Sequence, residues 1–262
     1  MPFTRRYDEA EPQRVNKWLA QAGVCSRREA EALIAQGLVS IDGETVSDAG
    51  RKILPGQTLT LADRSGSGRD SALTVVINKP VGLVSAQPEH GQVPAARLLT
   101  REALWGEAAA VPDSRASLAP LGRLDMDSRG LLILSQDGVL AKAVIGPLSE
   151  LDKEYLVEVQ GEITERKLGL LRHGLALDGR QLKPAKVSRV AGQRLRFVLK
   201  EGRNRQIRRM CEAVGLVVTD LLRIRIGPLQ LGDLPEGRWR PLAAEERAEL
   251  IRRAAAPQPP AR

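Results

Sequence analysis

The sequence predicts an α+β protein made of a small N-terminal unit and a larger strand-rich unit, and three features support this. Apolar residues between positions 15 and 34 recur at helical spacing and lead into a short hairpin pattern. Residues 64–72 are rich in Gly and Ser, which is typical of a flexible linker. From residue 73 onward, β-branched and alternating apolar segments are interleaved with helical ones.

The N-terminal unit is predicted to cover residues 12–63. Its first helix ends at Gly23, and a capping box formed by Ser26 and Glu29 begins the second helix. A turn at Asp42-Gly43 then predicts a hairpin, which short strands follow. Two helices and short strands are therefore expected here.

The larger unit is predicted to cover residues 73–253, followed by a Pro-rich disordered tail at 254–262. Its predicted strands are 73–78, 131–135, 154–159, 195–199 and 217–221, and its predicted helices are 139–145, 163–172 and 206–214. Residues 87–119 carry one short helical patch, at 97–105, and are interpreted as an excursion near the mouth of a site or as an ordered surface loop.

The formal net charge of +8 and the pI near 9.9 predict a polyanionic partner. Nucleic acid is favoured over a membrane because no strongly hydrophobic amphipathic segment accompanies the charge. Aromatic residues make up only 3% of the chain, which disfavours a stacking platform of several rings for single strands. Binding is expected to come instead from contacts to phosphates and from the stacking of arginine guanidinium groups on bases.

The chain lacks the features of a targeted, disulfide-bonded or metal-binding protein. The first residues hold no apolar run long enough for a signal sequence, and no segment approaches the roughly 18 apolar residues that span a bilayer, so a cytoplasmic protein is expected. Cys25 and Cys211 are far apart in helix-like patterns, which predicts reduced thiols. His90 and His173 have no partners at ligand spacing, so no metal is expected.

Three segments of the N-terminal unit resemble the RNA-binding domain named after ribosomal protein S-four. They read Arg14-Val-Asn-Lys-Trp-Leu, Gly23-Val-Cys-Ser-Arg-Arg-Glu-Ala and Gly37-Leu-Val-Ser-Ile-Asp-Gly. The resemblance implies that basic residues of the two helices face RNA, namely Arg14, Lys17, Arg27 and Arg28. Because acidic residues oppose them in the sequence, a solvated helix surface stays open as the alternative.

The segment from Gly122 to Gly138 places an acid, Asp125, in a Gly-bounded polar loop directly before an apolar strand. Such a loop is a rigid support for a functional carboxylate. From spacing alone, Asp125 and Asp127 are equally well explained as turn or N-cap residues.

This segment resembles the active-site loop of the RsuA/RluB/RluE/RluF group of pseudouridine synthases, in which the aspartate of Gly-Arg-Leu-Asp is essential. The similarity continues in Lys79–Ser85, in Lys153-Glu154-Tyr155 and in residues 201–211, and it extends from Arg14 to about Leu242. It implies a catalytic domain with a mixed, mainly antiparallel sheet and flanking helices. It also implies chemistry without a cofactor, because the isomerisation of uridine needs no redox change or energy source.

The resemblance assigns Asp125, Tyr155 and Arg208 to catalysis. Asp125 either attacks C1′ of the ribose or removes the C2′ proton, and the sequence does not choose between the two. Arg208 is expected to pair with Asp125 and keep it ionised in a closed pocket. Tyr155 is expected to stack on the base and help remove the C5 proton, with a structural strand tyrosine as the alternative.

Several further basic residues are predicted to contact RNA. Arg123 is placed to enter the RNA stack when the target nucleotide flips out. A dense basic group near the C-terminus suits phosphates, and consists of Arg203, Arg205, Arg209, Arg223 and Arg225. Some of these are expected only to solvate helix faces, and Asp127 is expected only to shape its loop.

Three other function classes fit the sequence less well. A binding-only RNA chaperone has no need for Asp125, Tyr155 and Arg208 together. A methyltransferase needs a Gly-rich turn after a strand, which we do not find, and a glycoside hydrolase needs a distinguished carboxylate pair.

Within the group, the sequence looks closest to the RluF-like branch, which modifies large-subunit (23S) ribosomal RNA and can also act on a tyrosine transfer RNA. Residues 204–212 and 234–242 carry this similarity. The expected partner is therefore structured RNA and the expected activity is that of a pseudouridine synthase. A small-subunit substrate stays open, and a monomer is expected.

Overall fold

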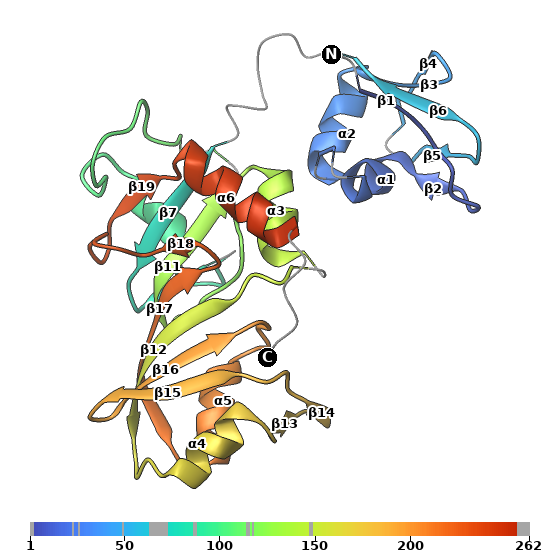
Figure 1. The fold of residues 1–262 in the computed structure, drawn as a ribbon. Helices are drawn as coiled ribbons and strands as arrows, with labels where there is room; N and C mark the ends of the chain where they lie inside the picture. The colour runs from blue at the N-terminus through green and yellow to red at the C-terminus, as the bar shows by residue number, and fades with distance from the viewer. Residues whose placement is uncertain are drawn as a thin grey trace. The chain divides into compact units, whose positions relative to one another are not determined.

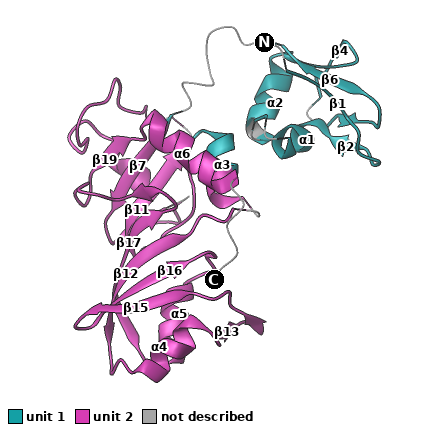
Figure 2. Cartoon of the chain, in the orientation of Figure 1, with its two compact units in different colours: residues 1–73, 136–142 teal, residues 74–135, 143–262 magenta. Residues whose placement is uncertain are grey.

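The computed structural model describes residues 3–22, 24–25, 27–48, 50–62, 73–85, 88–113, 116, 118–146 and 149–255 (Figure 1). The chain forms two compact units (Figure 2). Residues 1–73 group with 136–142 in the first unit, and residues 74–135 group with 143–262 in the second. Helix α3 (Gly138–Ile145) is divided between them. The predicted linker at 64–72 lies outside the described residues, so its role as a domain boundary stays a prediction.

The first unit contains the two predicted helices and two small groups of antiparallel strands. A four-stranded sheet has the order β1-β6-β3-β4, and β2 pairs with β5. The elements are β1 (Phe3–Arg6), β2 (Gln13–Arg14), α1 (Val15–Gln21), α2 (Arg27–Ala35), β3 (Val39–Ile41), β4 (Glu44–Thr45), β5 (Lys52–Ile53) and β6 (Thr58–Leu61). Strand β1 precedes residue 12, so the folded unit begins earlier than the sequence pattern indicated.

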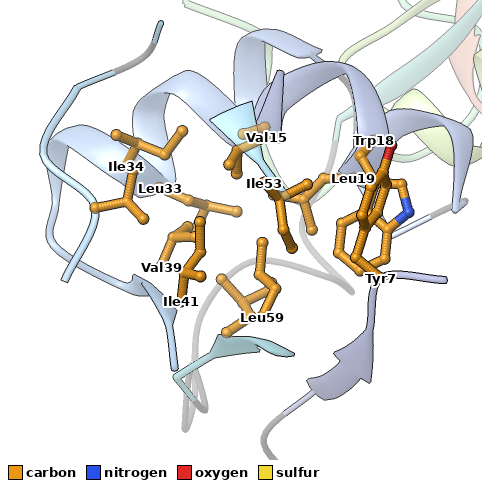
Figure 3. Packing of buried hydrophobic residues seen from close by; sticks show 13 residues of the cluster. Tyr7, Val15, Trp18, Leu19, Leu33, Ile34, Val39, Ile41, Ile53 and Leu59 are labelled. Atoms are coloured by element: carbon orange, nitrogen blue, oxygen red, sulfur yellow. The ribbon is translucent and has the colours of Figure 1, made fainter. Parts of the chain in front are cut away.

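Apolar residues from both helices and the strands form one core in the first unit (Figure 3). Val15 and Leu19 from α1 and Leu59 from β6 are fully buried in it. Helix α2 ends as predicted at Gly37, whose φ of +69° is in the left-handed region and whose N–H donates to the Ile34 carbonyl oxygen at 2.9 Å.

The second unit is built on a nine-stranded sheet of order β15-β16-β12-β17-β11-β7-β19, with β10 on β11 and β18 on β17. The strands are β7 (Thr74–Lys79), β10 (Ala119–Pro120), β11 (Arg129–Ser135), β12 (Lys153–Gln160), β15 (Lys186–Ala191), β16 (Arg194–Leu199), β17 (Val217–Ile226), β18 (Leu229–Gln230) and β19 (Trp239–Pro241). Only β11 and β17 pair in parallel within this sheet, so the expected mixed, mainly antiparallel sheet is confirmed.

Three helices belong to the second unit alone: α4 (Glu165–Arg172), α5 (Gln206–Ala213) and α6 (Ala244–Ala255). Helix α4 packs against β15, and α5 packs against β17, so helices flank the sheet as expected. Helix α6 includes the first two residues of the predicted tail, and residues 256–262 lie outside the described residues. None of the helices in the described ranges is long and apolar enough to cross a membrane.

The predicted helical patch at 97–105 is wrong. The structure has a single 3-10 turn there, η1 (Ala95–Leu98). The remaining residues up to 105 form turns and irregular backbone that bonds to β19. The Trp239 indole donates to the Thr100 carbonyl oxygen at 2.7 Å, and the Trp105 N–H donates to the Trp239 carbonyl oxygen at 2.8 Å. These bonds to a distant strand outweigh the local helix propensity, so the stretch is an ordered loop at this point.

The pairing of β12 with β17 contains a β-bulge that positions two arginines. Glu154 pairs with Arg225 and Tyr155 pairs with Arg223, so β17 carries one extra residue, Ile224, between the two pairs. Without the bulge, residues two apart on a strand would share a face. Because adjacent β12 residues point to opposite faces, the bulge sends Arg223 and Arg225 to opposite faces of the sheet.

Candidate active site

The loop that carries Asp125 is fixed by hydrogen bonds from a second loop. The Ser85 hydroxyl donates to the Leu124 carbonyl oxygen at 2.7 Å and accepts from the Leu124 N–H at 2.9 Å. The Gly82 N–H donates to the Met126 carbonyl oxygen at 2.8 Å. Residues 79–85, one of the motifs found in the sequence, therefore hold the backbone on both sides of Asp125.

A lysine lies buried under the same loop. The Lys79 ammonium donates to the carbonyl oxygens of Pro80 and Leu83, both at 2.8 Å. Burial lowers the pKa of Lys79 to about 8, although the charges of Asp127 and Asp125 act to raise it. Sequence reasoning assigned this residue no role, and the only signal was a lysine at the end of a largely apolar strand.

A cavity of about 690 Å³ brings the three predicted catalytic residues together. Asp125, Tyr155 and Arg208 all line it, and so do Arg123, Arg203 and Arg205. Tyr155, on β12, is 8% exposed, whereas the Asp125 side chain is 33% exposed. The carboxylate is thus accessible, next to a largely buried ring.

The ion pairs of the loop differ from the expected ones. We expected Arg208 to pair with Asp125, but its Nε lies 3.3 Å from the Asp127 carboxylate and its Nη2 donates to the Asp127 carbonyl oxygen at 2.6 Å. In the described part of the chain, the ion pair of Asp125 is with Arg205, at 3.7 Å. The reason is that Asp127 offers Arg208 both its carboxylate and its carbonyl oxygen.

Arg205 is held between the two aspartates. It lies 2.9 Å from the Asp127 carboxylate, in addition to its contact with Asp125. Its backbone at the start of α5 has φ 48° and ψ 32°, a left-handed conformation that costs about 1 kcal/mol for a residue with a Cβ. Burial acts to raise the pKa of Asp127, but the hydrogen bond from Arg205 and the charges of Arg208 and Arg205 outweigh it and keep this pKa below its ordinary value.

Two more of the predicted RNA contacts, besides Arg205, form hydrogen bonds within the protein. Arg203 donates to the carbonyl oxygens of Leu177, Arg180 and Gln181, and so holds the hairpin of β13 (Ala176–Leu177) and β14 (Arg180–Gln181). Arg209 makes a bidentate ion pair with Asp178 at 2.6 and 2.9 Å. It does not line the cavity.

The other predicted RNA contacts include exposed side chains. Arg123 is exposed at the cavity, and Arg14 and Arg27 are exposed on the first unit, where Lys17 is half-buried. The side chain of Arg28 lies outside the described part of the structure.

Arg223 and Lys153 also line the cavity, although sequence reasoning did not assign them to catalysis. Arg223 is 1% exposed, and its Nε donates to the Leu131 carbonyl oxygen at 2.8 Å. A Cβ at Gly130 would lie 2.3 Å from the Arg223 carbonyl oxygen, so only glycine permits this approach of β11 to β17. Lys153 precedes Tyr155 by two residues and therefore shares its face of β12.

The family profile described as RNA pseudouridylate synthase matches residues 73–213, which contain this loop and most of the cavity. The chain belongs to the RNA pseudouridine synthase family. The profile of the S4 domain matches residues 13–59, in agreement with the resemblance of the first unit. Both resemblances found in the sequence are thus confirmed.

Relatives match nearly the whole synthase chain. It is 34% identical over 243 residues to an RNA pseudouridine synthase of Aquifex aeolicus, covering 91% of this chain and 94% of the relative. It is also 34% identical over 244 residues to the dual-specificity RNA pseudouridine synthase RluF of Escherichia coli strain K12, covering 91% and 78%. A crystal structure of a pseudouridylate synthase superposes with a TM-score of 0.64 at 27% identity, over 90% of this chain and 99% of the other. The protein is therefore an RNA pseudouridine synthase.

The candidate site of this synthase includes carboxylates, arginines, lysines and a tyrosine. Across the residues that the structure describes, no group of three or more His, Cys, Asp or Glu is placed to hold a metal ion. Cys211 is buried, and burial raises the pKa of its thiol to about 12, so it is unreactive in the core. Proton transfer and charge stabilisation are the chemistry that side chains of these types can supply.

Proposed function

We propose that the synthase isomerises one uridine of large-subunit ribosomal RNA and that Asp125 is the carboxylate that acts on the ribose. The observation that carries this proposal is the position of Asp125, accessible at the cavity on a loop that Ser85 and Gly82 fix, beside Tyr155. The choice of RNA rests on the similarity to relatives named RluF and on the RluF-like segments of the sequence.

The reaction begins when the target uridine leaves its stack and enters the cavity. Unstacking costs a few kcal/mol, and the exposed guanidinium of Arg123 is suited to take the place of the base. The C1′–N1 bond then breaks, the base turns, and C5 bonds to C1′. Asp125 either attacks C1′ or removes the C2′ proton, and both routes require an ionised carboxylate.

The remaining residues of the site support these steps. Arg205 lies 3.7 Å from Asp125, where its charge favours the ionised carboxylate. Arg208 holds the loop through Asp127. Tyr155 is placed to stack on the base and to help remove the C5 proton, which is the last step.

RNA outside the cavity is bound by both units in this proposal. Arg14, Lys17, Arg27 and Arg28 of the first unit meet phosphates, and so does Arg209 of the second unit. Arg203 and Arg205 meet phosphates at the cavity itself, when RNA displaces part of their internal contacts. A monomeric state and a cytoplasmic location stay predictions.

The test is carbodiimide mapping of pseudouridine in total RNA from cells that lack the protein. The cells are complemented with wild type, Asp125→Asn or Asp127→Asn. We expect one large-subunit site to lose its signal, to be restored by wild type and not by Asp125→Asn. Asp127→Asn is the matched control two residues away, and it should restore the signal at least in part, because it weakens the loop and leaves the reacting carboxylate in place.

The other outcomes separate the alternatives. A lost site in small-subunit RNA or in tyrosine transfer RNA keeps the activity and changes the substrate. Full restoration by Asp125→Asn, or no lost site at all, contradicts the catalytic assignment and favours a protein that binds RNA without modifying it.

A further inference from the structure

Two cationic side chains lie beside Tyr155 in the wall of the cavity. Arg223 is the β17 partner of Tyr155 in the strand register, and Lys153 lies two residues before Tyr155 on the same face of β12. Both line the same cavity as Asp125. The mechanism given above uses neither of them.

Neither cation forms an ion pair with a carboxylate in the part of the chain that the structure describes. Among the described residues, neither has an ion pair within 4.0 Å, and the buried Nη2 of Arg223 has no hydrogen-bond partner. Asp152, the carboxylate that attracts Lys153, is already held by Arg225 at 2.7 and 3.1 Å. Burial and the positive charge of Arg223 lower the pKa of Lys153, so the two cations destabilise each other.

Uncompensated buried charge is costly, so this arrangement is suited to a ligand that brings negative charge. The isomerisation produces such a ligand. When the C1′–N1 bond breaks, its electron pair stays on N1, and the charge of the detached uracil spreads over N1, O2 and O4. The base must stay bound while it turns, until the C5–C6 π pair of the ring forms the bond from C5 to C1′. The C5 proton then leaves to a base and N1 gains a proton, so the atoms of the nucleoside are unchanged.

We propose that Arg223 and Lys153 form a receptor for the uracil anion, which stabilises the cleavage of the C1′–N1 bond and holds the base while it turns. This inference rests on the proposed function. Donors that are already in place where charge develops are the strongest form of such stabilisation, because they need no reorganisation during the reaction. The adjacent Tyr155 ring favours the base over a phosphate as the occupant, because a planar ring is suited to stack on it.

The test compares two leaving groups. Transcripts of the large-subunit ribosomal RNA are made with uridine or with 5-fluorouridine, whose base is the stronger acid and so carries negative charge more readily. Because C5 of the fluorinated base has no proton to lose, its C-linked product keeps the fluorine, and water adds across the C6=N1 bond that remains. The C-linked nucleoside formed in a single turnover is measured by mass spectrometry after denaturation and nuclease digestion. Variants Arg223→Lys and Lys153→Met are compared with wild type.

We expect each variant to lose about a hundredfold in rate on uridine and about tenfold or less on 5-fluorouridine, because the better leaving group needs less stabilisation. Arg225→Met is the matched control, since it removes an arginine from the same strand on the opposite face. It should change both rates by the same factor.

The outcomes separate the possible failures. Equal losses on both transcripts in Arg223→Lys and in Lys153→Met overturn the inference, because a structural role or a phosphate contact does not depend on the leaving group. If wild type forms no C-linked nucleoside from either transcript, the proposed function fails, and the inference fails with it. Lys153→Met keeps the test decisive if Arg223→Lys does not fold, because within the described residues Lys153 makes one long hydrogen bond, 3.3 Å to the Leu151 carbonyl oxygen.

Discussion

The arginines on the two faces of the β12–β17 pair differ in their partners. On one face, Arg225 is bonded to Asp152 at 2.7 and 3.1 Å and to Glu154 at 2.7 Å. On the cavity face, the partners of Arg223 among the described residues are carbonyl oxygens, and one of its buried nitrogens has no hydrogen bond to any of these residues. The hydrogen bond with Asp152 raises the pKa of Arg225 despite its partial burial.

This difference separates charges that stabilise the fold from charges that are available to a substrate. A paired guanidinium satisfies its own carboxylates and has little left to offer RNA. A buried guanidinium without a counter-charge lowers the free energy of unfolding. Other interactions in the protein must offset this loss. The comparison predicts that variants of the cavity face lose activity and that variants of the opposite face lose stability.

The largest expected effect is on the cavity side. Asp125→Asn should lower the single-turnover rate by about a thousandfold or more, because an amide neither attacks C1′ nor removes a proton. Its free energy of unfolding should stay within about 0.5 kcal/mol of wild type, since the ion pair with Arg205 is partly exposed. Rapid-quench kinetics and urea unfolding measure the two quantities. If Asp125→Asn lowers the free energy of unfolding and leaves the rate unchanged, the proposed difference between the two faces is wrong.

On the opposite face, Arg225→Met should lower the free energy of unfolding by about 2 to 3 kcal/mol, because it leaves Asp152 and Glu154 partly buried without their cation. Its rate on uridine should stay within a few-fold of wild type. Urea unfolding of Arg194→Met provides the control, since the pair of Arg194 with Glu158 is more exposed and should contribute less than about 1 kcal/mol. An Arg225→Met protein as stable as wild type would show that these ion pairs are dispensable.

The next prediction concerns Lys79 and the dependence of the free energy of unfolding on pH. Its pKa is lowered from 10.5 to about 8, so between these values the unfolded chain holds a proton that the folded chain has released. The free energy of unfolding of wild type should therefore rise with pH relative to Lys79→Met, by at most about 1.4 kcal/mol per pH unit. Paired denaturant titrations from about pH 8 to about pH 10 measure this difference. Parallel curves for the two proteins would exclude a depressed pKa at Lys79.

The smallest expected effect concerns Arg205. Its hydrogen bond helps to keep the pKa of Asp127 low, so this carboxylate contributes stability above its unfolded pKa that is lost as pH falls. Arg205→Met should remove less than about 1 kcal/mol of this contribution, because both side chains are more than a third exposed. Denaturant unfolding at about pH 6 and about pH 3 tests it. The difference from wild type should be present at the higher pH and smaller at the lower one, because the contribution is lost only as pH falls through the lowered pKa of Asp127 in the folded protein.

Much of the fold and site was predictable because local patterns encode it. The end of α2 at Gly37 and the turn at Asp42-Gly43 follow from backbone preferences, and both are present. The predictions of a mixed sheet and of a common site for Asp125, Tyr155 and Arg208 followed from the family resemblance that the motifs carry. The helical patch at 97–105 failed because its backbone bonds to Trp239, more than a hundred residues away in the chain.

By itself, the sequence determined the two resemblances, the residue types of the site and the basic charge that favours RNA. It treated Arg223 and Arg225 as one basic group, because they belong to the same local concentration of arginines in the sequence. Only the tertiary structure separated them. The bulge at Ile224 exists because β17 pairs with β12 on one side and with β11 on the other, and a strand register is a property of its neighbours rather than of its own residues.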